Sequence, residues 1–342
     1  MRILVTGGSG FIGSHTCVEL LNSGFEIVVI DNLVNSNKEA LKRVEKITGK
    51  ALIFKEVDIL DCDKLSSIFE EYEFHAVIHF AGFKSVSESV SQPLKYYYNN
   101  VIGTEKLCEV MLKYGVKSIV FSSSATVYGD PKNIPINESH NTHPTNPYGL
   151  SKLKAEQFLQ SLHRNDPAWK VLILRYFNPI GAHRSGLIGE DPNGIPNNLM
   201  PFISQVAVGK HKELKIYGND YETPDGSGIR DYIHVTDLAK GHVAAVEKIF
   251  QSDNNFNSEL IVNLGNGEGY SVFEVVNVFE KVNKRIIPFS VVNRRPGDIS
   301  ESFADVKKAK KELNWESEET IESMCQDSWL WQSNFPNGYL SD

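Results

Sequence analysis

The sequence predicts an α/β protein with a doubly wound parallel sheet and a smaller, irregular C-terminal domain. Two observations support this fold class. Short runs rich in β-branched residues alternate with amphipathic stretches through the first half of the chain, which is the pattern of strands joined by crossover helices. Several of these runs are almost continuously apolar, as expected for strands that helices cover on both faces.

The expected strands of the first half lie at residues 2–6, 26–31, 51–58, 76–82, 118–124 and 171–178. The expected helices between them span residues 12–23, 38–48, 62–71, 101–114 and 148–164. Gly, Pro and Asn then crowd residues 179–198, and the alternation weakens. We therefore assign residues 1–178 to a first domain and residues 179–342 mainly to a second. A helix at 231–250 and a strand at 260–267 are expected to return to the first domain.

Size and charge limit the classes of function. With 342 residues, 41% of them hydrophobic, the chain can bury a substantial core. A net charge of −8 argues against nucleic-acid binding, which needs a basic stripe. No run approaches the ~18 apolar residues of a transmembrane helix, so we expect no membrane span. The four cysteines form no C-x-x-C pair, which favours free thiols in a reducing, cytoplasmic setting.

A glycine-rich loop follows the first expected strand. Gly7, Gly10 and Gly13 recur at every third position, and a helix is expected to begin near Phe11. Glycines here allow a tight turn and let backbone N–H groups approach a pyrophosphate, which the helix N-terminus also attracts. The loop therefore predicts a dinucleotide site in a Rossmann-type domain. The alternative is an ordinary glycine-rich turn.

Asp31 ends the second expected strand. Its separation from Gly13 is close to the ~20 residues expected for the acid that binds the adenosine ribose. Asn32 and Leu33 follow, so no arginine stands ready for a 2′-phosphate. The pattern favours NAD over NADP, and a strand-end aspartate that caps a turn is the alternative.

Tyr148 and Lys152 are four residues apart at the start of an expected helix, with Asn146 as its cap and Pro147 as its first residue. Free tyrosine, with a pKa of about 10, is a poor base at neutral pH, but a cation within ~4–6 Å favours the phenolate. Ser124 ends a strand at the sheet edge where ligands bind. The three side chains predict a proton-transfer site. For the tyrosine and lysine alone, a surface pair is the alternative.

Together these motifs resemble the extended short-chain dehydrogenase/reductase superfamily. Further segments at residues 176–183, 189–201, 228–242 and 294–305 resemble the UDP-glucose 4-epimerase family, and the likeness covers essentially the whole chain. It implies an isomerase that interconverts UDP-galactose and UDP-glucose through a transient 4-keto sugar, with tightly bound NAD. Tyr148 would take the proton of the sugar 4-hydroxyl, Ser124 would bind that hydroxyl, and Lys152 would bind the nicotinamide ribose and lower the Tyr148 pKa.

The resemblance also implies the residues of two binding sites. The expected NAD contacts are Gly7, Gly10, Phe11, Ile12, Gly13, Asp31, Asn32, Asn35, Ser36, Asp58, Ile59, Phe80, Ala81, Gly82, Lys84, Asn99, Ser122, Tyr148, Lys152 and Tyr176. The expected UDP-sugar contacts are Ser124, Tyr148, Asn178, Asn198, Leu199, Tyr217, Arg230, Arg295, Asp298 and Ser302. Two arginines reserved for a diphosphate fit an otherwise acidic chain. For Arg230, an ion pair with Asp231 or Asp237 is the alternative.

Ser302 occupies a position at which some members of that family carry a tyrosine. A small side chain would leave room for a 2-N-acetyl group, so activity on UDP-GlcNAc and UDP-GalNAc is one hypothesis. Neutral drift at the rim of the site is the other.

Other functions have weaker support. Related nucleotide-sugar 4,6-dehydratases need an extra acid beside the active-site serine or threonine, whereas Ala125 and Thr126 follow Ser124. UDP-glucuronate decarboxylation or epimerisation fits the fold alone, and a catalytically silent dinucleotide sensor would be expected to lack one of the three catalytic side chains. The sequence contains no H-E-x-x-H, G-x-S-x-G or P-loop motif, so we expect neither a metal site nor a hydrolase. The helices at 101–114 and 148–164 would form a homodimer interface, or bury their apolar faces against the sheet.

Overall fold

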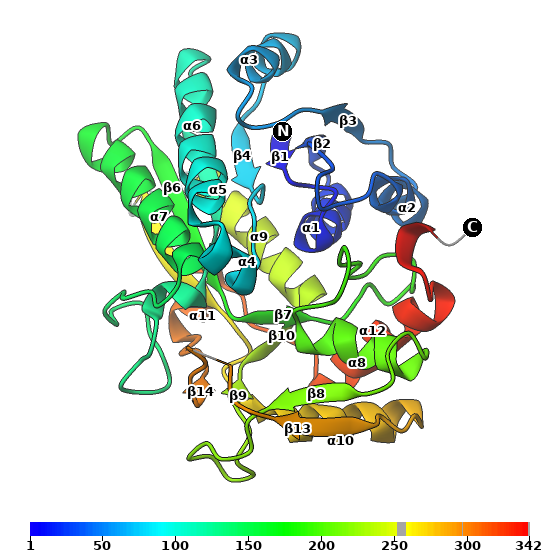
Figure 1. Ribbon diagram of the computed structural model, residues 1–342. Helices are drawn as coiled ribbons and strands as arrows, with labels where there is room; N and C mark the ends of the chain where they lie inside the picture. The colour runs from blue at the N-terminus through cyan, green and yellow to red at the C-terminus, as the bar shows by residue number, and fades with distance from the viewer. Residues whose placement is uncertain (252–257, 296, 341–342) are drawn as a thin grey trace.

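The computed structural model describes residues 1–251, 258–295 and 297–340. These residues contain a sheet of seven parallel strands in the order β11-β6-β5-β4-β1-β2-β3 (Figure 1). The strands are β1 (Arg2–Thr6), β2 (Glu26–Asp31), β3 (Ile53–Glu56), β4 (Ala76–His79), β5 (Ser118–Ser124), β6 (Lys170–Tyr176) and β11 (Glu259–Leu264). The winding direction reverses between β1 and β4, which is where ligands bind in such sheets. The predicted fold class is confirmed.

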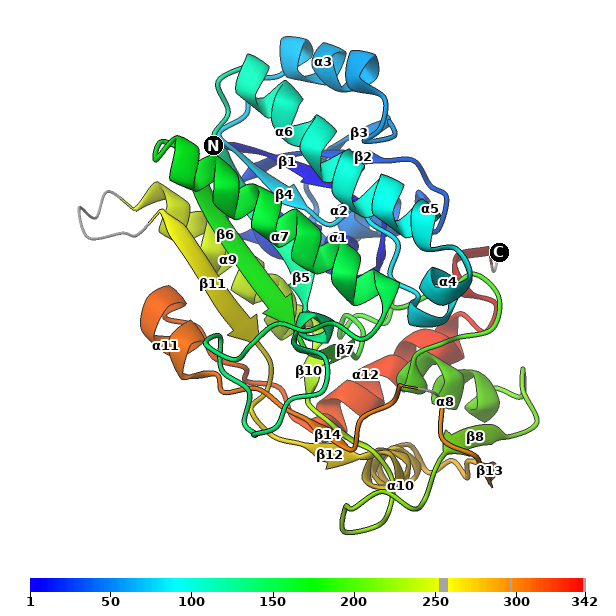
Figure 2. The same cartoon turned by 60° about the vertical axis from the view of Figure 1, so that its left-hand side comes forward.

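Helices cover both faces of this sheet. On one face lie α1 (Phe11–Asn22), α2 (Glu39–Thr48) and α9 (Val235–Phe250). On the other face lie α3 (Cys62–Glu71), α6 (Gly103–Lys113) and α7 (Pro147–Asn165). In Figure 2, α6 and α7 run in front of the strands and α9 runs behind them. The predicted strands and helices of the first half therefore exist, with ends that differ by a few residues.

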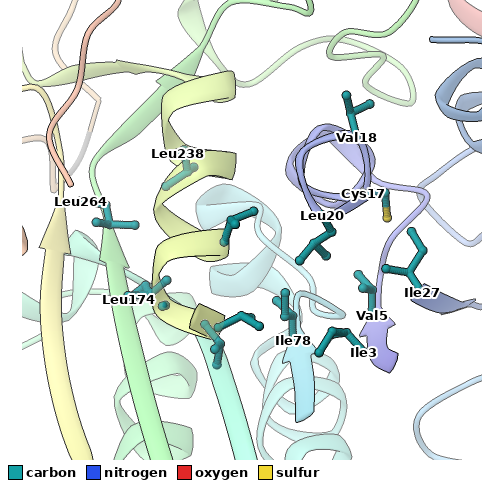
Figure 3. Close-up of a cluster of buried hydrophobic side chains, with 14 of the residues drawn as sticks. Ile3, Val5, Cys17, Val18, Leu20, Ile27, Ile78, Leu174, Leu238 and Leu264 are labelled. Carbon is teal, nitrogen blue, oxygen red and sulfur yellow. The ribbon is translucent and has the colours of Figure 1, made fainter. Parts of the chain in front are cut away.

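The larger core fills the space between the sheet and the α1–α9 layer. Figure 3 shows Val5 of β1 and Leu20 of α1 on one side of this cluster, with Leu238 of α9 and Leu264 of β11 on the other. All four side chains are fully buried, and each contributes about 1.5–3 kcal/mol relative to an exposed position. Leu4, the neighbour of Val5, points to the opposite face and packs with α3 and α6, as strand alternation requires. This two-sided burial holds the strand ends that carry the site.

A second lobe with its own core lies below the carboxyl ends of the strands. Its helices are α8 (Leu199–Ala207), α10 (Val272–Asn283) and α12 (Ile321–Asn334). Its strands are β7 (Asn178–Ile180), β8 (Leu214–Tyr217), β9 (Ile229–Arg230), β10 (Tyr232–His234), β12 (Tyr270–Ser271), β13 (Phe289–Val292) and β14 (Glu301–Ser302). The remaining elements are α4 (Val86–Ser91), α5 (Pro93–Tyr97), the π-helix η1 (Tyr98–Ile102), η2 (Ala125–Tyr128), α11 (Lys307–Leu313) and η3 (Gly338–Leu340).

The helix expected at 231–250 begins later than predicted. Its first residues form β10, which pairs in parallel with β7, and α9 starts at Val235 after His234 caps it by accepting the Thr236 N–H. The chain is held extended because the buried Asp231 carboxylate accepts N–H groups from Asn266, Gly267 and Ala304. The strand expected at 260–267 is β11, which extends the main sheet beside β6.

Two bulk expectations can be compared with the structure. The four cysteines carry free thiols, and three of them are buried while Cys62 is partly exposed. Among the described residues, no helix has the length and apolar character needed to cross a membrane.

Candidate active site

A cavity of about 340 Å³ lies at the carboxyl ends of the central strands. Loops after β1, β2, β4, β5 and β6 line it, together with residues 189–192 and the C-terminal Tyr339. It therefore sits where the strand order reverses and continues to the second lobe. The predicted site residues that line it are Gly7, Gly10, Phe11, Ile12, Gly13, Asp31, Asn32, Asn35, Ser36, Ile59, Phe80, Ala81, Gly82, Lys84, Asn99, Ser122, Ser124, Tyr148, Lys152, Tyr176, Asn178 and Asn198.

The glycine loop forms a close-packed turn at one end of the cavity. Gly7 has a φ of +70°, which disfavours other residues. A Cβ on Gly13 would lie 2.3 Å from the Gly7 carbonyl oxygen, so α1 packs directly on the loop. Gly10 caps α1 without a side-chain hydrogen bond, and the first turn contains no acidic residue. The first N–H groups of α1 are therefore available to an anion.

Asp31 is buried, at 6% exposure, where β2 ends at the cavity wall. Its carboxylate accepts hydrogen bonds from the Ser9 N–H (3.0 Å), the Leu33 N–H (3.0 Å) and the Ser36 hydroxyl (2.8 Å). Burial raises the pKa of Asp31, and these hydrogen bonds oppose that shift. The loop and the strand end are thus fixed to each other. Asp58 is absent from the cavity wall, but its carboxylate accepts the Asn32 side-chain amide at 2.8 Å and orients it.

Tyr148 and Lys152 project from the start of α7. The Asn146 side chain accepts the Gly149 N–H at 2.9 Å and Pro147 is the first helical residue, which confirms the predicted cap. Lys152 is 5% exposed, and its ammonium donates to the Ser122 carbonyl oxygen at 2.7 Å. Burial lowers the pKa of Lys152 to about 8.

The Tyr148 side chain is partly exposed and faces the cavity beside Ser124. Burial raises the pKa of Tyr148, and the hydrogen-bonding Ser124 side chain lowers it. The Ser124 hydroxyl oxygen accepts from the Thr126 N–H (3.2 Å) and the Thr126 hydroxyl (2.9 Å). Its own proton is therefore available to donate to a group in the cavity. The three residues predicted to move a proton thus meet at one wall.

Glu190 joins the two lobes at the cavity, and the sequence reasoning did not select it. Its carboxylate accepts the Lys84 ammonium and the Asn198 side-chain amide, both at 2.8 Å. Glu190 is only 9% exposed, whereas the Lys84 side chain is 56% exposed. The signal available in the sequence was its position in the segment 189–201. Tyr339, also missed, lies in the C-terminal P-N-G-Y segment.

The other predicted substrate residues lie in the second lobe, outside the cavity lining. The Arg295 guanidinium stacks 3.9 Å from the centre of the Tyr217 ring. Arg230 lies 4.0 Å from the Asp298 carboxylate, so this ion pair involves neither Asp231 nor Asp237. Ser302 is Arg230's partner in the β9–β14 pairing, and Leu199 begins α8.

No group of three or more His, Cys, Asp or Glu side chains in the described part of the chain could hold a metal ion.

Comparison with known proteins identifies the family. A family model described as GDP-mannose 4,6 dehydratase matches residues 4–328. The chain is 61% identical to UDP-glucose 4-epimerase from Bacillus subtilis (strain 168), covering 100% of this chain and 99% of that protein. The chain belongs to the UDP-glucose 4-epimerase family. Within this family, it is 50% identical to the human UDP-glucose 4-epimerase, with 99% of this chain and 98% of that protein covered.

Solved structures of UDP-glucose 4-epimerases share the fold. The enzyme from Bifidobacterium longum, in complex with NAD+ and UDP, superposes with a TM-score of 0.95 at 52% identity, covering 99% of this chain and 100% of that chain. The UDP-Glc/GlcNAc 4-epimerase from Campylobacter jejuni superposes with a TM-score of 0.84 at 36% identity, covering 97% and 99%. The first of these epimerases therefore holds its two ligands on the architecture seen here.

Proposed function

We propose that this protein is a UDP-glucose 4-epimerase that interconverts UDP-galactose and UDP-glucose through a transient 4-keto sugar, with NAD held in the cavity. The observation that carries the proposal is the meeting of Ser124, Tyr148 and Lys152 with a dinucleotide cradle in one cavity. The family and its NAD- and UDP-bound member support the same reading.

NAD fits the residues that are present. The uncapped start of α1 offers N–H groups to a pyrophosphate. The loop has no room for side chains at Gly7 and Gly13, so its backbone can approach the ligand closely. Asp31 offers acceptors to ribose hydroxyls and would repel a 2′-phosphate, which favours NAD over NADP. Bound NAD would supply the hydride acceptor, and its reduced form the hydride donor, for a reversible oxidation at the sugar.

Side chains of the protein transfer the proton. Tyr148 takes the proton of the sugar 4-hydroxyl and later returns it, while Ser124 donates a hydrogen bond to the same oxygen. The charged Lys152, buried beside Ser122, stabilises the Tyr148 phenolate and binds the nicotinamide ribose. In this proposal the UDP-sugar site includes two residues in the cavity, Asn178 and Asn198. It also includes residues beyond the cavity: Leu199, Tyr217, Arg230, Arg295, Asp298 and Ser302.

The test is incubation of the purified protein with UDP-galactose and no added cofactor. We expect UDP-glucose to form without net NADH. Net NADH, or a 4-keto-6-deoxy sugar, would overturn the proposal, and the second product would favour a dehydratase. The positions after Ser124, Ala125 and Thr126, argue against a dehydratase because they supply no acid.

Activity on the N-acetylated pair is a second proposal, motivated by Ser302. Its side chain is small, and it lies on β14 beside Arg230. The UDP-Glc/GlcNAc 4-epimerase of Campylobacter jejuni shows that the fold accepts both sugar types in one relative. Steady-state assays with all four nucleotide sugars decide the matter. Turnover of the acetylated pair that is lost in Ser302→Tyr would support the proposal, and no turnover in the wild type would exclude it.

A homodimer is proposed from exposed apolar side chains beside α7. Leu94 on α5 is 79% exposed and Tyr98 on η1 is 62% exposed, while Leu150 of α7 is 47% exposed. Both α5 and η1 pack on α7, so these side chains belong to neighbouring elements. Analytical ultracentrifugation of wild type and Leu94→Asp tests the proposal. We expect a dimer that dissociates in the variant, and a monomeric wild type would overturn it. Cytoplasmic location stays a prediction.

A further inference from the structure

A buried glutamate lies directly behind the proton-transfer residues on α7. Tyr148, Lys152 and Glu156 follow one another at intervals of four residues, so they occupy one face of the helix. Glu156 is fully buried. Its carboxylate accepts two hydrogen bonds from the Arg175 guanidinium, from Nε at 3.0 Å and from Nη2 at 2.6 Å, and a third from the Ser123 hydroxyl.

The end of β5 contacts all three helix residues. The Ser124 side chain interacts with Tyr148, the Ser122 carbonyl oxygen accepts the Lys152 ammonium, and the Ser123 hydroxyl donates to Glu156. Ser123 is paired across the strands with Arg175 of β6. Three consecutive serines therefore position three consecutive turns of α7, and the third turn carries a charge that the proposed chemistry does not use.

A buried ion pair is weak evidence of stabilisation by itself. Desolvation of both ions offsets much of their attraction, and apolar replacements of such pairs are often neutral or stabilising. The position of this pair suggests another purpose. Lys152 is buried in the second turn of α7, and burial disfavours its positive charge.

We propose that Glu156 is a positioning residue of the active site, whose buried carboxylate keeps Lys152 charged and thereby keeps Tyr148 able to accept a proton. This inference rests on the proposed function for its catalytic consequence. The carboxylate acts through Lys152 and does not contact the substrate.

The charged and titratable groups around the pair agree with this assignment. On α7, the Glu156 charge raises the pKa of Lys152 against the effect of burial. From β4, the neighbouring His79 is fully buried and its pKa is lowered to about 3, so it is neutral at physiological pH. From β6, Arg175 is engaged by Glu156 and lies 4.9 Å from the centre of the Tyr128 ring.

The remaining titratable groups around the site are tyrosines and one further acid. Tyr176 of β6 and Tyr96 of α5 face Tyr148, and burial raises the pKa of both phenols, so they are neutral. Glu138 faces Tyr128 from the loop after η2, where it accepts the Asn263 N–H. Glu156 is thus the carboxylate that acts on Lys152.

The experiment compares pH profiles of UDP-galactose turnover by the NAD-containing enzyme. In Glu156→Gln, Lys152 loses its proton at lower pH because the neighbouring negative charge is gone. The alkaline limb of the profile, where turnover falls as the pH rises, should therefore move to lower pH by about one unit. A shift of this size is expected for a charge about one helical turn away in a protein interior. Glu156→Asp keeps the charge and should keep the limb near its wild-type position. Ser123→Ala removes one hydrogen bond to the same carboxylate and should also leave the position of the limb unchanged.

A second variant guards against misfolding caused by an unpaired Arg175. Glu156→Gln combined with Arg175→Met removes both charges of the pair. Loss of the Arg175 cation favours the Lys152 charge, so the limb should move in the same direction but by less. If the profiles of both Glu156→Gln proteins differ from wild type only in height, Glu156 is merely structural and the inference is wrong.

A spectroscopic readout needs no substrate. Ultraviolet difference absorption against Tyr148→Phe, in each background, reports the tyrosinate of Tyr148 as pH rises. We expect less tyrosinate in Glu156→Gln than in wild type just above neutral pH, and an equal amount would overturn the inference. If wild type does not epimerise UDP-galactose, the proposed function fails while this measurement still tests the Glu156–Lys152–Tyr148 coupling.

Discussion

Substitution of Gly13 by alanine should lower both the stability of the fold and the affinity for NAD. The added Cβ would lie 2.3 Å from the Gly7 carbonyl oxygen and 2.7 Å from the Gly8 Cα. Both neighbours are backbone atoms, and Gly7 is held at a φ of +70°, so neither can move aside cheaply. Overpacking of this kind costs about 1–3 kcal/mol, and we expect the upper end, about 3 kcal/mol.

The matched control is Gly10→Ala in the same loop. A Cβ on Gly10 would meet only the Gly7 oxygen, at 3.3 Å, so its effect on stability should be small. Thermal unfolding without cofactor should show Gly13→Ala melting about 4 °C below wild type, at about 1.4 °C per kcal/mol for a chain of 342 residues. Because relief of the clash moves the start of α1, the dissociation constant for NAD should rise about tenfold or more, equivalent to about 1.4 kcal/mol. A Gly13→Ala protein with the melting temperature and NAD content of wild type would refute the packing argument.

Three further predictions follow from the site and the lobe beneath it. Tyr148→Phe should lower turnover about 10²–10⁴-fold while NAD remains bound; near-wild-type turnover would remove Tyr148 from the role of base. Wild-type turnover should fall as the pH rises through about 8, since the pKa of Lys152 is lowered to about 8 and its cation supports the Tyr148 phenolate; a rate that stays flat well above that pH would contradict this. The folded-state pKa of Asp231 is raised from 3.8 to about 6, so its ionisation should reduce stability as pH rises from about 4 to about 6. Asp231→Asn should remove that dependence, yet it should lower the free energy of unfolding at pH 7 by about 1–3 kcal/mol, because one amide oxygen cannot accept all three N–H groups. Denaturant titration across this pH range measures both effects.

The first lobe was predictable because its glycine loop, Asp31, Ser124 and Tyr148 stand at strand ends or a helix start. Parallel strands bring their carboxyl ends to one edge, so Gly7, Asp31 and Ser124 had to meet once the strands were recognised. The start of α7 was equally local, since Asn146 and Pro147 determine where the helix begins. Such signals depend on neighbouring residues alone.

The second lobe was not predictable in this way. Strands of two or three residues, such as β9, β12 and β14, are too short to show an alternating pattern. They form because tertiary contacts, among them the buried Asp231 carboxylate, hold the chain extended. Glu190 was missed for a related reason, because its partner Lys84 lies on a loop of the other lobe and nothing beside it in the sequence indicates the contact.

Two ion pairs would explain how an acidic protein could receive an anionic diphosphate at the proposed site. Lys84 is paired with Glu190 at 2.8 Å, and Arg230 lies 4.0 Å from Asp298. The Arg230–Asp298 pair is partly exposed, and exposed ion pairs typically stabilise a fold by only about 0–1 kcal/mol. A diphosphate that replaced Asp298 as the partner of Arg230 would therefore displace little stabilisation and gain charge-assisted hydrogen bonds of its own. In the proposed site the carboxylates would orient the cations before the ligand arrives, so the net charge of −8 would be no obstacle to binding UDP-sugars and NAD.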